Sequence, residues 1–258
     1  MKKLFALASI GLAAFIAVSG EVNAEEAAKN NKLTDNEVIA LKSLLSEDAK
    51  ANFEGDDSLF NYEYIPVSAK EMFKVYAANE VRGDKTYKNK KVLISGVVKK
   101  ISSSIGDAPV VSLETGDNFR TVNLSFAKKY HDIAIDLNKN QKITFACVGG
   151  TVVMGIPYVS DCKPVDIAIQ ESVNSKMAGI NRALSDPKSV DDKNVFVLIV
   201  MAKAVGGVTD NFKSCKPDDI NCISDKIEAM PKEEGDFQTL MKKTAEDMGI
   251  ELPGYDKK

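Results

Sequence analysis

Residues 91–101 read KVLISGVVKKI, and this stretch decides the fold. β-Branched and polar residues alternate on both sides of Gly96, which predicts a β-strand with a bulge or sharp bend at the glycine. The same kind of alternation predicts four more strands, at 109–114, 119–126, 141–148 and 151–162. Turns are expected between them, at Gly106-Asp107, at Gly116-Asp117-Asn118 and at Gly149-Gly150. A long first strand bent at a glycine suits a small closed barrel.

Residues 127–137 (AKKYHDIAIDL) have helical spacing and separate the third strand from the fourth. The order strand, strand, strand, helix, strand, strand is that of the five-stranded OB-fold, in which the helix closes one end of the barrel. Alternation points Phe126 and Phe145 inward. We therefore predict an α+β protein: a five-stranded OB-like β-barrel with N-terminal helices and a C-terminal helical appendage.

The first 24 residues have the three parts of a secretory signal peptide. Lys2 and Lys3 precede an apolar run from Leu4 to Val18, and Val22-Asn23-Ala24 places small residues where cleavage is decided. The run is shorter than the roughly 20 residues of a permanent membrane helix, although an uncleaved anchor is the alternative. A lipid anchor needs a cysteine directly after the cleavage point, and the first is Cys147. We expect cleavage after Ala24 and a periplasmic or secreted protein.

Four segments are expected: a signal peptide (1–24), an N-terminal helix with a connector (25–67), the OB-fold domain (68–166) and a helical C-terminal region (167–258). Thr34 or Asp35 is predicted to cap the first helix, and 52–66 to form an irregular connector. A capping box of Ser68 and Glu71 starts a helix that runs to Gly83. C-terminal helices are expected at 167–184, at 191–205 with Gly206-Gly207 as its end, after Pro217-Asp218-Asp219, and at 233–249.

The segment that enters the barrel resembles a known family. Its characteristic residues are Tyr76, Asn79-Glu80, Asp84, Tyr87-Lys88, Lys90, Val92, Ile94, Gly96 and Val98. This run is similar to the tRNA anticodon-binding-like OB-fold domains of exported bacterial proteins of unknown function. The resemblance covers about residues 68–166 and includes Cys147 and Cys162. It implies the OB fold but no particular ligand, and Arg82-Gly83 departs from the small apolar residues usual at that place.

Four cysteines in an exported chain are expected to form disulfides. Sequence alone allows three pairings. We favour Cys147 with Cys162 and Cys215 with Cys222, because each pair closes a short loop within one predicted unit.

No reactive grouping stands out, so we expect no catalytic residue, no metal site and no cofactor. His131 is the only histidine, which excludes paired-histidine sites, and the cysteines lack the spacing of zinc knuckles. OB barrels can host nucleases, which use carboxylates and arginines. Asp107, Glu114 and Asp117 lie near the second and third strands, but acidic residues are common in turns.

Ligands of OB barrels usually bind on the second and third strands and the flanking loops. The candidate ligand-binding residues are accordingly Lys99, Phe119, Arg120, Thr121, Asn123 and Tyr158. We predict a non-enzymatic periplasmic binding module for a protein, peptide or envelope polymer.

The alternative function is binding of an anionic polymer, either nucleic acid or glycan. Residues 70–166 carry 15 Lys or Arg against 10 Asp or Glu, although the whole chain has a net charge of −3. The most basic stretch contains Lys85, Lys88, Lys90, Lys91, Lys99 and Lys100, which could hold phosphates or guard the edge of the first strand. Exposed aromatic side chains for base stacking are few, so nucleic acid is not the favoured partner.

Overall fold

The computed structural model describes residues 32–252, except for residues 59, 105, 187–193, 217–218, 230–233 and 251. The predicted signal peptide and the C-terminal tail lie outside the described residues. Clustering of contacts divides the chain into two units. One is a barrel unit of residues 53–56 and 61–170, and the other is a helical unit of residues up to 52, 57–60 and 171 onward. The boundaries expected after residues 67 and 166 remain a prediction.

The barrel consists of β2 (Lys91–Ser103), β3 (Pro109–Glu114), β4 (Thr121–Phe126), β5 (Lys142–Val153) and β6 (Ile156–Lys163). Strands follow the order β2-β3-β4-β6-β5, and β5 pairs with β2 to close the ring. All of these pairs are antiparallel except β4 with β6, which is parallel. This order confirms the predicted OB-like barrel.

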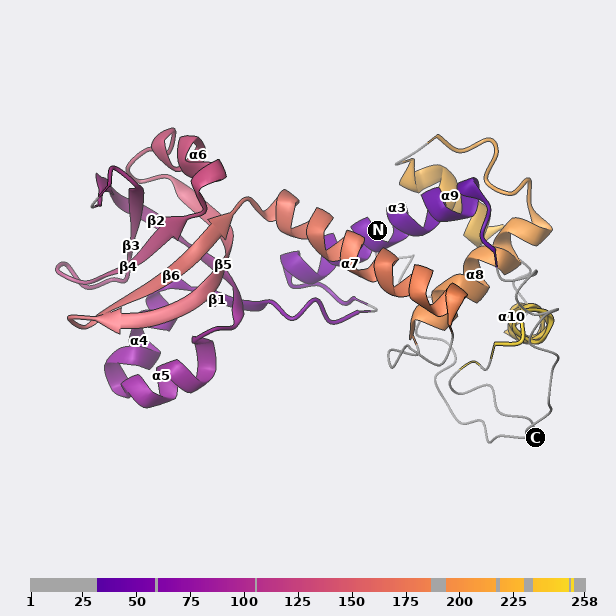
Figure 1. The fold of residues 1–258 in the computed structure, drawn as a ribbon, viewed down its shortest axis with the longest axis horizontal. Helices are drawn as coiled ribbons and strands as arrows, with labels where there is room; N and C mark the ends of the chain where they lie inside the picture. The colour runs from indigo at the N-terminus through magenta and orange to yellow at the C-terminus, as the bar shows by residue number, and fades with distance from the viewer. Residues whose placement is uncertain are drawn as a thin grey trace. The chain divides into compact units, whose positions relative to one another are not determined.

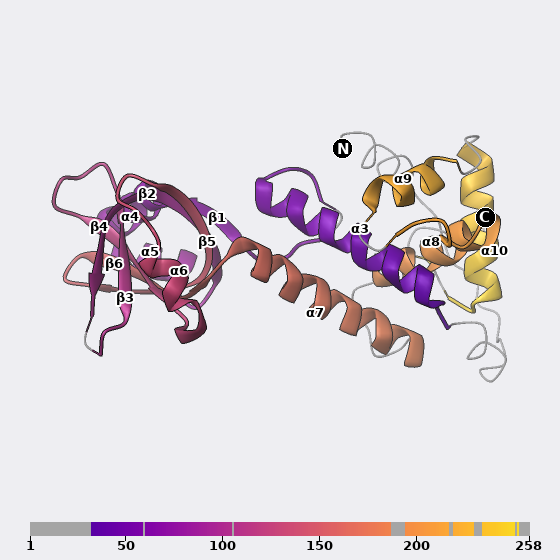
Figure 2. The ribbon, with the colours of Figure 1, turned by 90° about the horizontal axis from the view of Figure 1, so that it is seen from above.

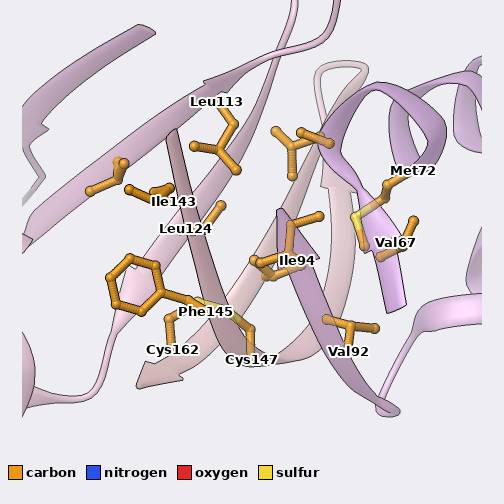
Figure 3. Close-up of a cluster of buried hydrophobic side chains, with 14 of the residues drawn as sticks. Val67, Met72, Val92, Ile94, Leu113, Leu124, Ile143, Phe145, Cys147 and Cys162 are labelled. Carbon is orange, nitrogen blue, oxygen red and sulfur yellow. A yellow bond between two sulfur atoms is a disulfide. The ribbon is translucent and has the colours of Figure 1, made fainter. Parts of the chain in front are cut away.

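Short helices cover the two ends of the barrel (Figures 1 and 2). At one end are α4 (Ala69–Ala78) and α5 (Glu80–Tyr87); at the other are η1 (Lys128–Tyr130) and α6 (His131–Ile135). Met72 of α4 and Ala134 of α6 belong to the same core cluster as the inward side chains of the strands. Figure 3 shows part of this core. Phe126 and Phe145 face inward as predicted, with ring centroids 4.9 Å apart.

An additional strand, β1 (Ile65–Ser68), runs parallel to β2. It pairs with residues 92–95, whereas β3 begins to pair with β2 only at Val98. The prediction of an irregular connector to residue 66 was therefore wrong for its last residues. The sequence argued against a strand here because Pro66 lacks the N–H that a central strand needs. β1 is an edge strand, where proline is tolerated.

The helix predicted from Ser68 to Gly83 is two helices. Ser68 caps α4 as expected and accepts a hydrogen bond from the Glu71 N–H. Asn79 interrupts the helix, because its backbone is extended and its side chain accepts the Arg82 N–H, which starts α5. Gly83 lies against the Tyr76 ring, where a Cβ would overlap the ring atoms. The glycine thus lets α5 pack closely on α4.

Gly149-Gly150 lies inside β5, so the turn predicted there was wrong. The turn is at Met154-Gly155, where both residues have positive φ. A Cβ on Gly149 would overlap the Tyr87 carbonyl oxygen, and one on Gly150 would lie 2.6 Å from the Tyr158 carbonyl oxygen. These glycines serve close backbone approach, which has the same sequence signature as a turn.

Both predicted disulfides are confirmed. Cys147 of β5 bonds to Cys162 of β6, and Cys215 bonds to Cys222 of α9 (Ile220–Glu228). The first pair is buried in the barrel core. Disulfides are consistent with a periplasmic or extracellular location, because they persist in oxidising compartments.

The helical unit contains α3 (Asp35–Glu54) up to Asn52, α7 (Val165–Ser185) from Glu171, α8 (Asn194–Val208), α9 and α10 (Glu234–Asp247). The predicted start of α8 at 191 lies outside the described residues. Nearly every side chain in the first part of α8 is buried, as predicted for a core helix. None of the described helices combines the length and apolar character needed to cross a membrane.

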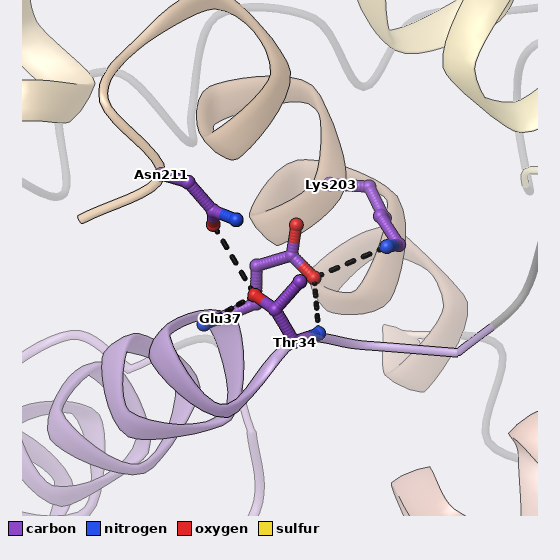
Figure 4. Close-up of polar contacts among 4 residues, drawn as sticks. All are labelled: Thr34, Glu37, Lys203 and Asn211. Carbon is purple, nitrogen blue, oxygen red and sulfur yellow. Dashed lines mark hydrogen bonds and ion pairs between the residues drawn. The ribbon is translucent and has the colours of Figure 1, made fainter. Parts of the chain in front are cut away.

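A polar cluster links the start of α3 to α8 (Figure 4). Thr34 caps α3 by a reciprocal capping box with Glu37, at 2.7 Å and 3.3 Å. The Glu37 carboxylate is buried and pairs with Lys203 of α8 at 3.2 Å. A Cβ on Gly206 would lie 2.8 Å from Glu37 Oε1, so this glycine makes room for the carboxylate. The prediction that Gly206-Gly207 ends the helix was therefore wrong.

Tyr76 gives the barrel unit a testable alkaline transition. Burial and the neighbouring Asp84 carboxylate raise the pKa of Tyr76 from 10.0 to about 12. Because the folded pKa exceeds the unfolded one, the stability linked to this proton is complete below pH 10 and is lost as pH rises through the folded pKa. Ultraviolet titration should show that Tyr76→Phe removes a tyrosinate signal that appears near pH 12. An unchanged titration curve would contradict this assignment.

Candidate functional site

Four polar side chains form a row across the outer face of the barrel. Lys100 of β2 is in register with Ser112 of β3, Ser112 with Asn123 of β4, and Asn123 with Tyr158 of β6. Val111 and Leu113 beside Ser112, Val122 and Leu124 beside Asn123, and Val159 beside Tyr158 belong to the core cluster, and Ile101 beside Lys100 packs against it. Because side chains alternate along a strand, the four row residues point away from the core. We call them the polar row.

Several hydrogen-bonding groups of the polar row have no partner within the described part of the chain. Thr121 Oγ1 donates to Asn123 Oδ1 at 3.0 Å, which leaves the Asn123 amide hydrogens for another acceptor. Ser112 and Asn123 are 8% and 9% exposed, so these groups lie deep between their neighbours. In the described part of the chain, the Ser112 hydroxyl, the Tyr158 phenol and the Lys100 ammonium have no hydrogen-bond partner. None of these unpaired atoms is among the fully buried side-chain atoms that lack a partner in the described residues, so they reach solvent and can pair with a polar ligand.

Two hairpin tips border the row. In the β3–β4 loop, Asp117 Oδ1 accepts the N–H groups of Phe119 at 2.7 Å and Arg120 at 3.1 Å, which fixes a tight turn. Arg120 Nη1 donates to the Met154 carbonyl oxygen of the β5–β6 turn at 3.1 Å. A Cβ on Gly155 would lie 2.6 Å from the same guanidinium nitrogen. Arg120 therefore ties the two tips together.

Lys99 stabilises the β3–β4 tip from β2. Its Nζ donates to the carbonyl oxygens of Asn118 at 2.6 Å and Asp117 at 3.4 Å. The side chains at the ends of the tips project outward: Phe119 and Met154 are each 90% exposed. The tips thus combine two cations, Lys99 and Arg120, with two exposed apolar groups.

The structure brings all six predicted site residues to this side of the barrel. Thr121, Asn123 and Tyr158 lie on the outer face, and Lys99, Phe119 and Arg120 at the tips. Their role in binding remains a prediction. Sequence reasoning missed Met154, because the turn was placed at Gly149-Gly150; the Met154-Gly155 pair was the signal that could have located it.

Lys88 and Lys90, which precede β2, and Lys91, the first residue of that strand, are held by local contacts. Lys88 pairs with Asp84 at 3.0 Å, and Lys90 Nζ donates to the Lys85 carbonyl oxygen at 2.7 Å. Lys91 pairs with Glu63 at 3.3 Å and lies over the Tyr64 ring. Lys99 and Lys100 are therefore the members of the basic stretch that contribute charge beside the polar row.

The carboxylates considered for a nuclease do not form a metal site within the residues that the structure covers, where no group of three or more His, Cys, Asp or Glu could hold an ion. Asp117 instead shapes the turn that presents Phe119. His131 is half-buried, with Nε2 3.2 Å from the Phe126 carbonyl oxygen.

Comparison with known proteins identifies a family for this chain. No curated protein matches the chain. A solved structure from Klebsiella pneumoniae subsp. pneumoniae MGH 78578, provisionally described as a nucleic acid-binding lipoprotein, is similar at 16% identity with a TM-score of 0.32. That match covers 38% of this chain and 89% of the other. The tRNA_anti-like family model matches residues 1–163, more than half of the chain. The resemblance seen in the residues of the barrel is thus confirmed, and the chain belongs to the tRNA_anti-like family.

Proposed function

We propose that this chain is a non-enzymatic binding module of the bacterial envelope, whose ligand lies across β3, β4 and β6. The observation that carries the proposal is the polar row, in which Lys100, Ser112, Asn123 and Tyr158 are in register and present unpaired groups. The two disulfides support the location, because such bonds persist in oxidising compartments.

The chemistry of the polar row favours a peptide, a protein segment or an envelope polymer. Three of its four groups are neutral hydrogen-bonding groups, and only Lys100 is charged. With strands about 4.8 Å apart, a row across four strands spans roughly 14 Å. That length matches about four residues of an extended peptide. Alternating donors and acceptors on such a chain would satisfy the row better than phosphates alone.

A second candidate ligand is an anionic polymer, which is favoured by three cations. Lys99, Lys100 and Arg120 have no carboxylate partner in the part of the chain described by the structure. If each neutralises one phosphate, affinity for a single strand falls with a log–log salt slope of about −2, or roughly 20-fold between 50 mM and 200 mM salt.

Native mass spectrometry tests the main proposal. The mature protein, isolated gently from its own envelope, should carry a reproducible extra mass. Asn123→Ala combined with Tyr158→Ala should reduce the occupied fraction at least about tenfold, because each lost buried hydrogen bond costs roughly 1 kcal/mol or more. Ser125→Ala is the matched control, since Ser125 lies on the same strand two positions from Asn123. Equal occupancy in the double variant and the control would refute the polar row as the ligand site.

The second candidate is tested with the oligonucleotide dT12. Tight binding at low salt with the steep salt dependence above would establish an anionic polymer as ligand. Absence of dT12 binding at 50 mM salt, together with an extra mass that depends on the polar row, would favour a peptide or envelope polymer as the ligand.

A further inference from the structure

We propose that the two hairpin tips dock the barrel on a bilayer that contains anionic phospholipid. This inference goes beyond the proposed function, because it uses the ends of the β3–β4 and β5–β6 hairpins and not the polar row. Its occupant is a lipid surface.

Exposure of apolar side chains at the tips is the first observation. Phe119 and Met154 are each 90% exposed, and Val153, next to Met154, is 48% exposed. They sit on two turns that the Arg120–Met154 hydrogen bond holds together. Single exposed apolar residues are common, but neighbouring ones at the ends of two joined hairpins mark an interaction surface.

Positive charge beside these side chains is the second observation. Arg120 and Lys99 reach the tips through hydrogen bonds to Met154 and Asn118. Lys70 of α4 also approaches, since a Cβ on Gly116 would lie 3.7 Å from its Cε. Each Lys or Arg close to an anionic bilayer contributes attraction. The nearby carboxylate of Asp117 accepts two backbone N–H groups within the turn, which partly offsets its charge.

The shape and chemistry of the tips favour lipid over nucleic acid. Bases stack on flat aromatic faces in a groove. Here one phenylalanine is accompanied by Met154 and Val153, which offer no stacking face; Phe119 and Met154 lie in the loops at the tips, and Val153 is the last residue of β5. An apolar projection with cations beside it matches the requirements of the headgroup boundary, where apolar groups enter and Lys and Arg remain at the surface.

A single tryptophan can report the insertion directly. The chain contains no Trp, so Phe119→Trp places one indole at the tip. The protein used begins at Glu25. It is titrated with vesicles of phosphatidylcholine that contain about one-third phosphatidylglycerol. We expect a blue shift of the emission and quenching by brominated lipid. Val81→Trp is the matched control, because Val81 is an 80% exposed apolar residue of α5 and not of a hairpin tip, and it should show neither effect.

Vesicle sedimentation measures the contribution of the tips. Phe119→Ser combined with Met154→Ser should lower binding to the anionic vesicles at least about tenfold, because two apolar side chains no longer enter the interface. Val81→Ser should change binding less than about twofold, and vesicles of phosphatidylcholine alone should bind the native chain weakly.

Three results would overturn the proposal. They are failure of the native chain to bind the anionic vesicles, equal binding by the tip variant and the native chain, and displacement from the vesicles by dT12, which would assign the tips to nucleic acid. Met154→Ser alone should retain the mass bound through the polar row, and Asn123→Ala with Tyr158→Ala should retain vesicle binding. The two proposals can therefore fail separately.

Discussion

Gly149→Ala should destabilise the barrel by about 3 kcal/mol, at the upper end of the cost of adding a methyl group to a packed site. The added Cβ would overlap the Tyr87 carbonyl oxygen, which belongs to the backbone and cannot rotate away. Relief requires β5 to move from the segment that joins α5 to β2. That movement would strain the hydrogen bonds of Gly149 with Asn89 and Lys90, both 2.8 Å long. Urea unfolding followed by circular dichroism measures the loss.

Gly207→Ala is the matched control for this substitution. Gly207 lies within α8, and a Cβ there would meet nothing within 4 Å. Alanine favours a helix over glycine by up to about 1 kcal/mol, so this variant should be slightly more stable than the native chain. If both variants unfolded at the native urea concentration, the close approach at Gly149 would not constrain the barrel.

Replacing Cys147 and Cys162 together by alanine should lower the free energy of unfolding by about 3 kcal/mol. The link joins residues 15 positions apart, and both sulfur atoms are buried in the core. Its loss frees the unfolded chain and removes packed atoms between β5 and β6. The expected result is a lower unfolding midpoint under non-reducing conditions.

The second disulfide provides the comparison. Cys215 and Cys222 are 7 positions apart and only half-buried, so their double alanine variant should lose less, about 2 kcal/mol. The reverse order of the two losses would show that loop length and core packing do not determine these contributions.

The barrel could be predicted from the sequence because inward and outward residues alternate along much of each strand. Val111, Leu113, Val122 and Leu124 belong to the core cluster as the alternation requires, and this placed Asn123 on the outer face. The register across strands could not be predicted, because bulges such as the one between Val98 and Lys100 shift it. A shift of one residue exchanges the faces of a strand, so the polar row emerged only from the structure.

Glycine positions were the main source of wrong predictions. Sequence shows that a Cβ is missing but not why. Gly155 serves a turn with positive φ, whereas Gly149 and Gly206 make room for Tyr87 and Glu37. The choice depends on residues far away in the chain, which have no local signature. Asn79 also led to a wrong prediction. Its capping hydrogen bond divides a helix whose apolar spacing continues without interruption.

The helical unit is built from segments that lie before and after the barrel in the sequence, and this affects the order of folding. Glu37 of α3 can pair with Lys203 only after the barrel, which lies between these residues in the sequence, has been synthesised. A chain that emerges from its N-terminus can complete the ring of β2 to β6 while α3 still lacks its partners on α8. Until α8 has been synthesised, α3 therefore lacks these partners, and its apolar side is open to chaperones or premature association during that interval.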